Sequence, residues 1–227
     1  MWYMDVNRSS REVFMKRFVI CITVVSFLLM AAPSFAVDLT GMFGVGAFAG
    51  YGMGFGDAFE DVESEFYTME SSLQFNFGGT ARYNFNPNMG VRAAVEYQTW
   101  KMESTVKSGA PAGMLESDET ENWIGITADF AYTLMPEGNT MPYFIVGPGI
   151  YIPSAEGLDS KLGFNGGVGV LHFFSPTMAL DAGAKFTMIP SAYDEIKEGS
   201  MTGETESKSI TAAQIWVGFS YFFGGEM

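Results

Sequence analysis

From residue 37 onward the chain alternates between apolar and polar positions in short segments. The last of these segments, Gln214 to Phe223, is typical: Ile215, Val217 and Phe219 are apolar, and smaller or polar residues lie between them. A period of two predicts a β-strand with one face buried. No part of the chain beyond Val37 shows a convincing helical period. The pattern predicts eight strands, at about residues 41–55, 71–85, 90–103, 120–134, 141–152, 161–174, 178–190 and 209–223.

The predicted strands are joined by connections that alternate in length. The three short ones each place a proline-centred polar turn between an aromatic or apolar strand end and a methionine, as in "YNFNPNMG". A meander with tight turns at one end and long loops at the other closes naturally into a barrel. The strand lengths also suit membrane spans. We therefore predict an all-β fold, an eight-stranded antiparallel up-and-down transmembrane barrel, with short connections at 86–89, 135–140 and 175–177 and long ones at 56–70, 104–119, 153–160 and 191–208.

The contents of the two strand faces decide which face meets lipid. In four of the predicted strands one face is bulky and uncharged, and the other carries small polar residues with three charges of each sign. A water-exposed surface would carry charge at roughly a quarter to a third of its positions. Eight strands leave an interior just wide enough for side chains. We favour a structural network of paired interior charges over a pore constriction that tunes ion passage; the residues are Arg82, Arg92, Glu96, Asp129, Asp181 and Lys185.

Aromatic residues gather near both ends of the predicted strands. Because transmembrane barrels carry an aromatic girdle at each membrane interface, this clustering supports a membrane location. A plain strand preference of aromatic residues is the alternative, but it does not explain clustering at strand ends. The predicted girdles consist of Tyr83, Phe85, Tyr132, Tyr143, Phe174, Tyr221 and Phe223 near the short turns, and of Tyr67, Tyr97, Trp123 and Tyr151 near the long loops.

We expect residues 1–36 to be a segment that is removed before the barrel folds. Lys16 and Arg17 precede an apolar run from Phe18 to Met30, and "SFA" follows as a small-x-small cleavage site. This is the pattern of a secretory signal peptide, and the run is too short for a membrane-spanning helix. Met1 and Met15 both remain open as the start. The predicted mature domain, 37–227, lacks the single Cys of the chain and carries 24 acidic against 8 basic residues, a net charge of −16. Such acidity excludes a nucleic-acid partner.

The final strand carries a recognisable terminal motif. Gly218 is followed by aromatic Tyr221 and Phe223, and the chain ends four residues later. Over residues 37–223 the chain resembles small bacterial outer-membrane β-barrels of the OmpA/OmpX-like type. The resemblance implies that these three residues form the signal read by the barrel-assembly machinery. It also implies a location in the outer membrane among its lipids and lipopolysaccharide. It implies no cofactor, and it leaves the oligomeric state open.

One histidine is the best candidate for chemistry. His172 lies three residues before Ser175. A lipid-A deacylase like PagL is an eight-stranded barrel with a His–Ser pair, but that pair lies near the outer rim. Here the spacing differs and the residues fall beside a predicted short, periplasmic turn. We interpret His172 as an interfacial residue beside Phe173 and Phe174, and predict that the protein is not an enzyme.

Two further features leave alternatives open. The long loops are acidic, which indicates a solvated surface or, alternatively, bridging through Ca²⁺ or Mg²⁺; whether a metal binds is unknown. Pro148 interrupts a predicted strand, and with Gly147 and Gly149 it predicts a bulge or a local gap. Together with inward-facing Trp100 and Trp216 this gap suggests a small apolar cavity with a lateral exit.

The function that we predict from the sequence is that of a non-enzymatic outer-membrane barrel with a structural or surface-interaction role. The alternative, suggested by the region around Pro148, is an OmpW-like passage of small hydrophobic molecules across the outer membrane. A lipid-modifying enzyme comes third.

Overall fold

The computed structural model of the chain describes residues 37–55, 62–63, 67–106, 117–154, 159–196 and 205–225. The residues from Ala36 onward form one compact unit. The predicted leader, 1–36, and much of the predicted long loops lie outside the described residues. Within the described part of the chain, no helix is long and apolar enough to span a membrane.

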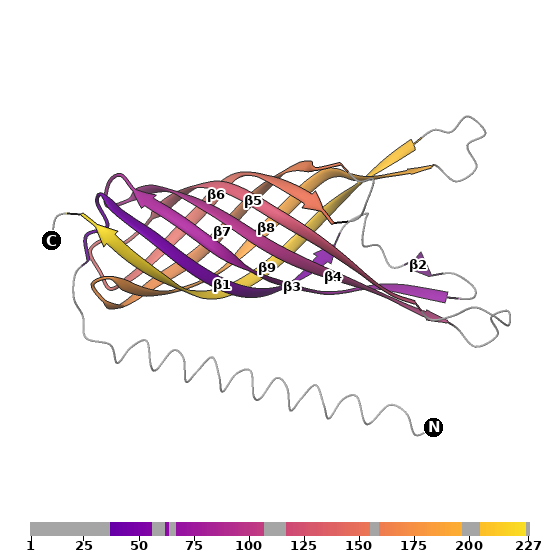
Figure 1. Cartoon of the computed structure of the whole chain (residues 1–227), viewed down its shortest axis with the longest axis horizontal. Helices are drawn as coiled ribbons and strands as arrows, with labels where there is room; N and C mark the ends of the chain where they lie inside the picture. Colours follow the sequence, from indigo (N-terminus) through magenta and orange to yellow (C-terminus); the bar gives the residue numbers. More distant parts are fainter. Residues whose placement is uncertain are drawn as a thin grey trace, which may run out of the picture. The chain divides into compact units, whose positions relative to one another are not determined.

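The unit is a closed barrel of antiparallel strands (Figure 1). Each strand pairs with its neighbours in the chain, and β1 pairs with both β9 and β3, so that the sheet closes into a ring. The two-residue β2 adds only to the start of β3 and is not part of the ring. The predicted eight-stranded fold is confirmed. The strands are β1 (Met42–Phe55), β2 (Val62–Glu63), β3 (Tyr67–Asn84), β4 (Met89–Val106), β5 (Ser117–Thr133), β6 (Thr140–Pro153), β7 (Lys161–Ser175), β8 (Met178–Ile196) and β9 (Thr205–Gly224).

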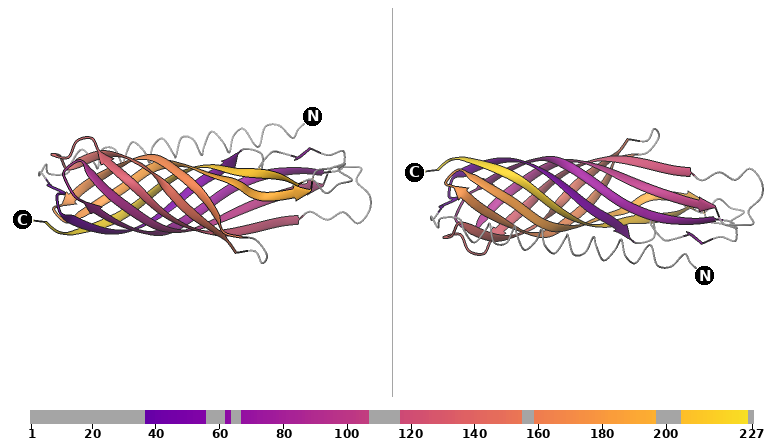
Figure 2. Two further views of the ribbon diagram at one scale, coloured as in Figure 1. Left: turned by 90° about the horizontal axis from the view of Figure 1, so that it is seen from above. Right: turned by 90° about the horizontal axis from the view of Figure 1, so that it is seen from below.

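Several strands are longer than predicted at their long-loop ends (Figure 2). The predicted loops 56–70, 104–119 and 191–208 include residues that pair as strand, such as 67–70 in β3 and 205–208 in β9. The prediction failed there because it followed hydrophobic alternation, and the alternation stops where the side chains become polar. The backbone ladder does not depend on side-chain polarity, so it continues beyond the last apolar residue.

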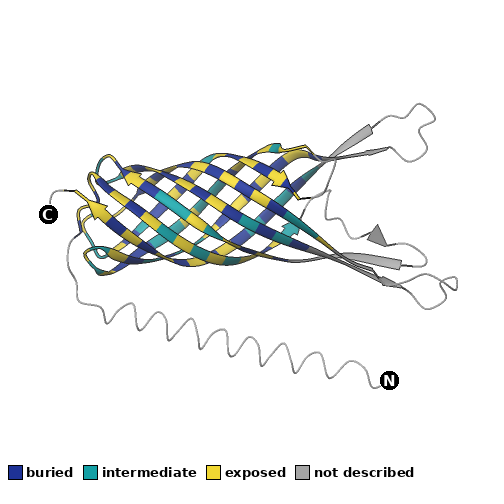
Figure 3. Ribbon diagram, in the orientation of Figure 1, coloured by how far each residue is buried: buried dark blue, intermediate teal, exposed yellow. Residues whose placement is uncertain are grey.

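Burial alternates along most of the barrel (Figure 3), and β7 departs from the pattern where Leu171, His172 and Phe173 are buried in succession. Outward residues are large, apolar and exposed: Val95 is 53% exposed and Phe219 is 62% exposed. Inward neighbours are buried, and they include all six charged residues predicted to face the axis. The apolar face therefore points outward, as the face composition predicts.

The aromatic girdles were only partly predicted correctly. Near the short turns, Tyr83, Phe85, Tyr132, Phe174, Tyr221 and Phe223 are exposed on the outer surface. Tyr143, Trp123 and Tyr151 instead lie inside the barrel, each 1% exposed or less. Tyr97 is half-buried, and the side chain of Tyr67 lies outside the described residues. For Tyr143, Trp123 and Tyr151 the position along the strand was predicted correctly, but the face was not.

The first prediction tests the outward face. Val95 lies near the middle of the barrel part of β4, so Val95→Arg places a charge deep in lipid. We expect it to lower the free energy of unfolding by about 2–4 kcal/mol. The measurement is urea-induced unfolding in phospholipid vesicles.

The matched control is Leu134→Arg. Leu134 is exposed just after β5, at the short-turn end, where the same charge costs about 0–1 kcal/mol. Equal losses for the two variants would contradict the orientation of the barrel.

Candidate functional site

The barrel interior is stratified along the axis. The inward positions of β8 run Ala179, Asp181, Lys185, Thr187 and Ile189 from the short-turn end to the long-loop end, so apolar residues bracket polar ones. The inward positions of β9 repeat this order in reverse, with Ile210 and Ala212 at the long-loop end, Gln214 in the middle and Phe222 at the short-turn end. We refer to the three parts as the turn-side layer, the polar layer and the loop-side layer.

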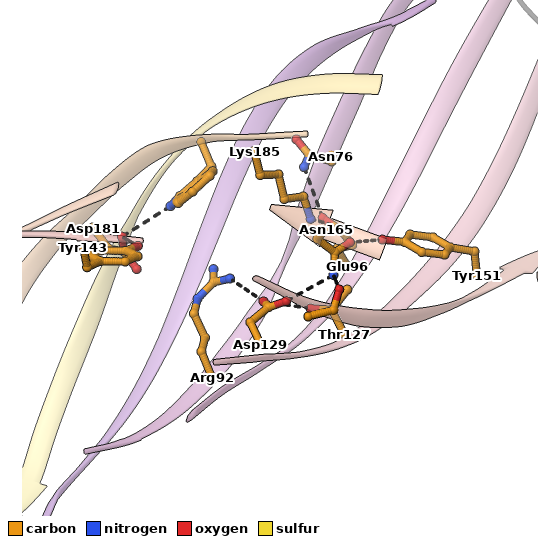
Figure 4. Close-up of polar contacts among 12 residues, drawn as sticks. Asn76, Arg92, Glu96, Thr127, Asp129, Tyr143, Tyr151, Asn165, Asp181 and Lys185 are labelled. Carbon is orange, nitrogen blue, oxygen red and sulfur yellow. Dashed lines mark hydrogen bonds and ion pairs between the residues drawn. The ribbon is translucent and has the colours of Figure 1, made fainter. Parts of the chain in front are cut away.

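The polar layer contains a buried ion pair between Lys185 and Glu96 (Figure 4). Lys185 Nζ donates to Glu96 Oε1 at 2.6 Å, and Gln98 Nε2 donates to the same carboxylate at 2.7 Å. Asn76 Nδ2 lies 3.4 Å from the other carboxylate oxygen and 3.1 Å from Gln214 Oε1. A charge this deeply buried requires both a counter-charge and hydrogen bonds, and Glu96 has both.

A second ion pair joins Arg92 and Asp129, which lie directly opposite each other on β4 and β5. Their charged groups are 3.5 Å apart. Asn165 Nδ2 donates to Asp129 at 3.1 Å. The Arg92 guanidinium also lies 6.0 Å from the ring of Phe48 and 5.6 Å from that of Trp216. Two aromatic faces and one carboxylate thus surround this cation.

Arg82 lies directly opposite Arg92 on the neighbouring strand, a like-charge pair that is unfavourable by itself. Arg82 donates from Nε to Asn84 Oδ1 and from Nη2 to Thr133 Oγ1, both at 2.9 Å. Its guanidinium lies 4.9 Å from the centre of the Tyr143 ring. The Tyr143 hydroxyl in turn donates to Asp181 at 2.5 Å. Arg82 and Asp181 are therefore connected through Tyr143.

All six charged residues predicted from the sequence lie in the polar layer. Four of them form two direct ion pairs. The sequence analysis missed the neutral members Tyr143, Asn165 and Gln214, and it did not give Trp216 a polar partner, although its indole Nε1 donates to Asp181 at 3.3 Å. Their inward parity is the signal that could have found them. Charged residues give a stronger signal than these neutral ones because charge is rare on these strands.

Glycines on neighbouring strands make room for the large inward side chains. A Cβ added to Gly183 would lie 2.5 Å from Trp216, and one added to Gly169 would lie 2.5 Å from Tyr143. At Gly44 the nearest atom would be a ring carbon of Phe222, 2.7 Å away. Inside a narrow barrel, aromatic side chains therefore require residues without a Cβ beside them.

The turn-side layer contains an apolar cluster. The rings of Phe173 and Phe222 have centroids 5.1 Å apart. Met141 is paired with Leu171, and Leu39, just before β1, is fully buried. Beside this apolar cluster, the last inward residues of β3 and β5 are polar: Asn84 and Thr133 are buried and bonded to Arg82.

The loop-side layer is a second apolar cluster, formed by inward residues of β4, β5, β6, β8 and β9. Trp216 belongs to the polar layer instead, so the structure does not place the two inward tryptophans, Trp100 and Trp216, in one apolar cavity. The members of the loop-side layer are Trp100, Trp123, Tyr151, Ile189, Ala192, Ile210 and Ala212.

Gly147, Pro148 and Gly149 lie at a local break in the β5–β6 ladder. Pairing continues on both sides of the break in the same register, so this is a gap and not a bulge. The ladder to β7 runs through all three residues. A Cβ on Gly147 would collide with the carbonyl of Ala128, so the two backbones approach closely here. On the inner side, the ring of Tyr151 lies against Gly149, and Asn165 Nδ2 lies 3.4 Å from the Gly147 carbonyl.

His172 and Ser175 have separate partners. His172 is buried, and its Nδ1 is 2.8 Å from Thr140 Oγ1. The Ser175 hydroxyl accepts from the amides of Thr177 and Met178 at 3.4 and 3.0 Å, which holds the turn into β8. His172 and Ser175 therefore bond to different groups, and the His–Ser pair considered in the sequence analysis is not formed.

The three terminal-motif residues occupy the end of β9. Gly218 faces inward, where a Cβ would meet Phe48. Tyr221 and Phe223 are exposed on the outer surface, with ring centroids 6.1 Å apart. Their role in assembly stays a prediction.

Most side chains of the acidic loops lie outside the described residues. Within the described part of the chain, no group of three or more His, Cys, Asp or Glu side chains is placed to hold a metal ion. Divalent-cation binding by the loops therefore also stays a prediction.

Comparison with known proteins gives one family and several similar structures. A family model described as "Outer membrane protein beta-barrel domain" matches residues 22–223. The outer membrane protein OprG from Pseudomonas aeruginosa is 14% identical, with a TM-score of 0.51 over 83% of this chain and 99% of that chain. Neisserial surface protein A (NspA) is 17% identical, with a TM-score of 0.53 over 80% of this chain and 98% of that chain. No curated protein sequence matches the chain significantly. At these identities the structures support the fold alone.

The second prediction concerns the Lys185–Glu96 pair. Lys185→Met leaves the Glu96 carboxylate buried without its counter-charge, and we expect a loss of about 3–5 kcal/mol in unfolding free energy. Adding Glu96→Gln removes the uncompensated charge, so the double variant should lose less than Lys185→Met alone. Both are measured by unfolding in vesicles.

Lys161→Met at the rim of β7 is the control, with an expected change within about 0.5 kcal/mol. Additive losses from the two polar-layer substitutions would show that the pair is not coupled.

Proposed function

The chain belongs to the outer membrane protein β-barrel domain family and is a small β-barrel of the bacterial outer membrane, and from this premise we propose that it is a non-enzymatic structural barrel that presents loops at the cell surface. Its strands hold a closed scaffold in the membrane. The connections at the long-loop end then form the part available to partners outside the cell.

The observation that carries this proposal is the filled interior. The polar layer is occupied by paired side chains, and clusters of packed apolar side chains lie toward both ends of the barrel. A pore for hydrophilic solutes needs a continuous water-lined path, and eight strands leave little room for one. The separation of His172 from Ser175 supports a role without catalysis.

The outer wall supports bilayer lipids as the direct partners of the barrel. A groove of about 540 Å³ runs between outward side chains of β5, β6 and β7, including Phe130, Phe144 and Val168. It is almost entirely apolar, which suits acyl chains. We extend the proposal to lipopolysaccharide at the loop end and to the barrel-assembly machinery, which would read the terminal motif around Tyr221 and Phe223.

Passage of small hydrophobic molecules is the second candidate, because the ladder between β5 and β6 is interrupted beside Pro148. A lateral exit would need space behind that interruption. The interior side is filled by Tyr151, whose hydroxyl donates to Asn165, and Asn165 also bonds Asp129. These contacts favour the structural role over passage.

The third prediction tests the closed interior. In planar lipid bilayers the purified barrel should show at most small, unsteady conductance, because paired and packed side chains fill the narrow interior. A large and stable single-channel conductance of the native sequence would exclude the proposed structural role.

The fourth prediction separates the two candidates. Pro148→Val restores a backbone donor at the gap, and under the structural role the uptake of a hydrophobic compound by cells should not change. Ile150→Val, an outward position on the same strand, is the control. Uptake that falls with Pro148→Val but not with Ile150→Val would instead support passage of hydrophobic molecules as the function.

A further inference from the structure

At the long-loop side of the barrel, β5 has an open hydrogen-bonding edge. β5 projects beyond the end of β6 (Figure 2), and the last residues paired between the two strands are Trp123 and Pro153. One further backbone bond, from the Ser154 amide to the Asn122 carbonyl at 2.8 Å, ends the ladder. Residues 117–121 therefore pair with β4 on one side, and no described residue pairs with them on the other.

The direction of the free backbone groups follows from this ladder. In an antiparallel sheet, alternate residues of a strand bond to the same neighbouring strand. The Asn122 carbonyl and the Leu134 amide both bond toward β6, so the even-numbered residues direct their backbone groups to that side. Asp118 and Thr120 are the next two even-numbered residues, and β6 does not reach them. Each presents one N–H and one C=O to the open side.

An edge of this kind accepts an extended chain as an additional strand, because its free backbone groups are already aligned. At its other edge the same sheet is covered, where β2 pairs Val62 with Met69 of β3. Among the described residues the edge of β5 has no such cover. It is therefore the side at which a strand from another molecule can be added.

The strands beside this edge are acidic. Glu70, Glu103 and Asp118 occupy directly paired positions on β3, β4 and β5, and like charges in such positions are unfavourable. A cationic partner relieves this repulsion, whereas a second copy of the chain adds to it. The outer ends of β3, β4 and β5, at 67–71, 100–106 and 117–122, contain one basic residue, Lys101, and five acidic ones, Glu70, Glu103, Asp118, Glu119 and Glu121.

A small pocket lies where β6 leaves β5, at the base of the open edge. The half-buried Glu121 carboxylate meets the Trp123 indole there, and Nε1 donates to Oε2 at 3.4 Å. A carboxylate in a pocket with polar walls suits the cationic end of a lysine or arginine side chain. The pocket has a volume of about 170 Å³ and is lined by Thr120, Glu121, Asn122, Trp123, Pro153 and Ser154.

We propose that the open edge of β5 binds a basic, extended peptide segment of a partner protein as an additional strand, with a lysine or arginine side chain in the pocket at Glu121. Backbone hydrogen bonds to Asp118 and Thr120 supply affinity, and the pocket selects the basic side chain. The proposal rests on the surface-interaction part of the proposed function and adds the chemistry of the partner.

The probe is a synthetic peptide of alternating lysine and threonine with blocked ends. Its fully N-methylated form keeps the charges but has no backbone donors, and a form with glutamate in place of lysine reverses the charge. Binding to the purified barrel in phosphatidylcholine nanodiscs is measured by calorimetry. Hydrogen exchange of the Asp118 and Thr120 amides is followed by NMR.

Two substitutions test the two parts of the site. Thr120→Pro removes an N–H at the open edge and leaves the ladder to β4 intact, so binding should weaken about 3- to 10-fold; Thr120→Val keeps the N–H and should bind as the native protein does. Glu121→Gln should weaken binding about tenfold. Its control is Glu137→Gln, which makes the same charge change at an exposed position of the β5–β6 turn.

We expect the two amides to exchange fast in the free protein and more slowly with the lysine peptide, and we expect no binding of the N-methylated and glutamate forms. Absence of binding by the lysine peptide would overturn the proposal. Equal binding of the N-methylated form would also overturn it, because charge attraction alone would then explain the binding. Slow exchange in the free protein would show that the chain or a second copy already covers the edge, with the same consequence.

If Thr120→Pro does not fold, the N-methylated peptide and the exchange of the native protein decide by the same criteria. A large conductance of the native barrel would refute the proposed structural role. A closed barrel that does not bind the lysine peptide would refute only the present proposal, so the two failures are distinguishable.

Discussion

The structure depends on one constraint, which is that every backbone amide and carbonyl in a hydrocarbon environment must find its partner within the chain. The pairing of β1 with both β9 and β3 meets this constraint by removing the free edges of the sheet. Once the ring is closed, alternate residues of each strand must face lipid or the axis, because the side-chain period is two. The outward apolar surface and the inward polar layer follow from this division.

Closure then creates a second problem, because a small ring leaves an interior too narrow for free water and too large to leave empty. The chain fills it with long polar and aromatic side chains, and glycines opposite them provide the space, as at Gly183 beneath Trp216. Charged side chains are tolerated there only with a counter-charge or hydrogen-bond partners. Lys185 meets Glu96 directly, and Arg82 reaches Asp181 through the ring and hydroxyl of Tyr143.

Much of this follows from the sequence, but through only two of its signals. Alternation predicted the eight strands and the facing of residues such as Arg92 and Val95, because a one-residue shift would put charge into lipid. The place of an aromatic residue along its strand predicted its position along the barrel axis. It did not predict whether the residue faces lipid or the interior, so Trp123 and Tyr151 were assigned to a girdle although they lie inside. Partners such as Tyr143 and Asp181 depend on the register between strands distant in sequence, which no local pattern reports. The strand extensions at the long-loop end were missed for a related reason, since hydrophobicity marks contact with lipid and not hydrogen bonding.

The gap at Pro148 shows why a sequence irregularity does not by itself give a route through the wall. Proline removes one backbone donor, and the ladder to β5 is interrupted beside it. The flanking Gly147 has no Cβ, which lets its backbone lie against that of Ala128 in place of the missing pairs. Because the register is the same above and below, the two strands do not separate, and Tyr151 packs behind the gap. The same glycines that suggested an opening therefore allow the wall to stay closed.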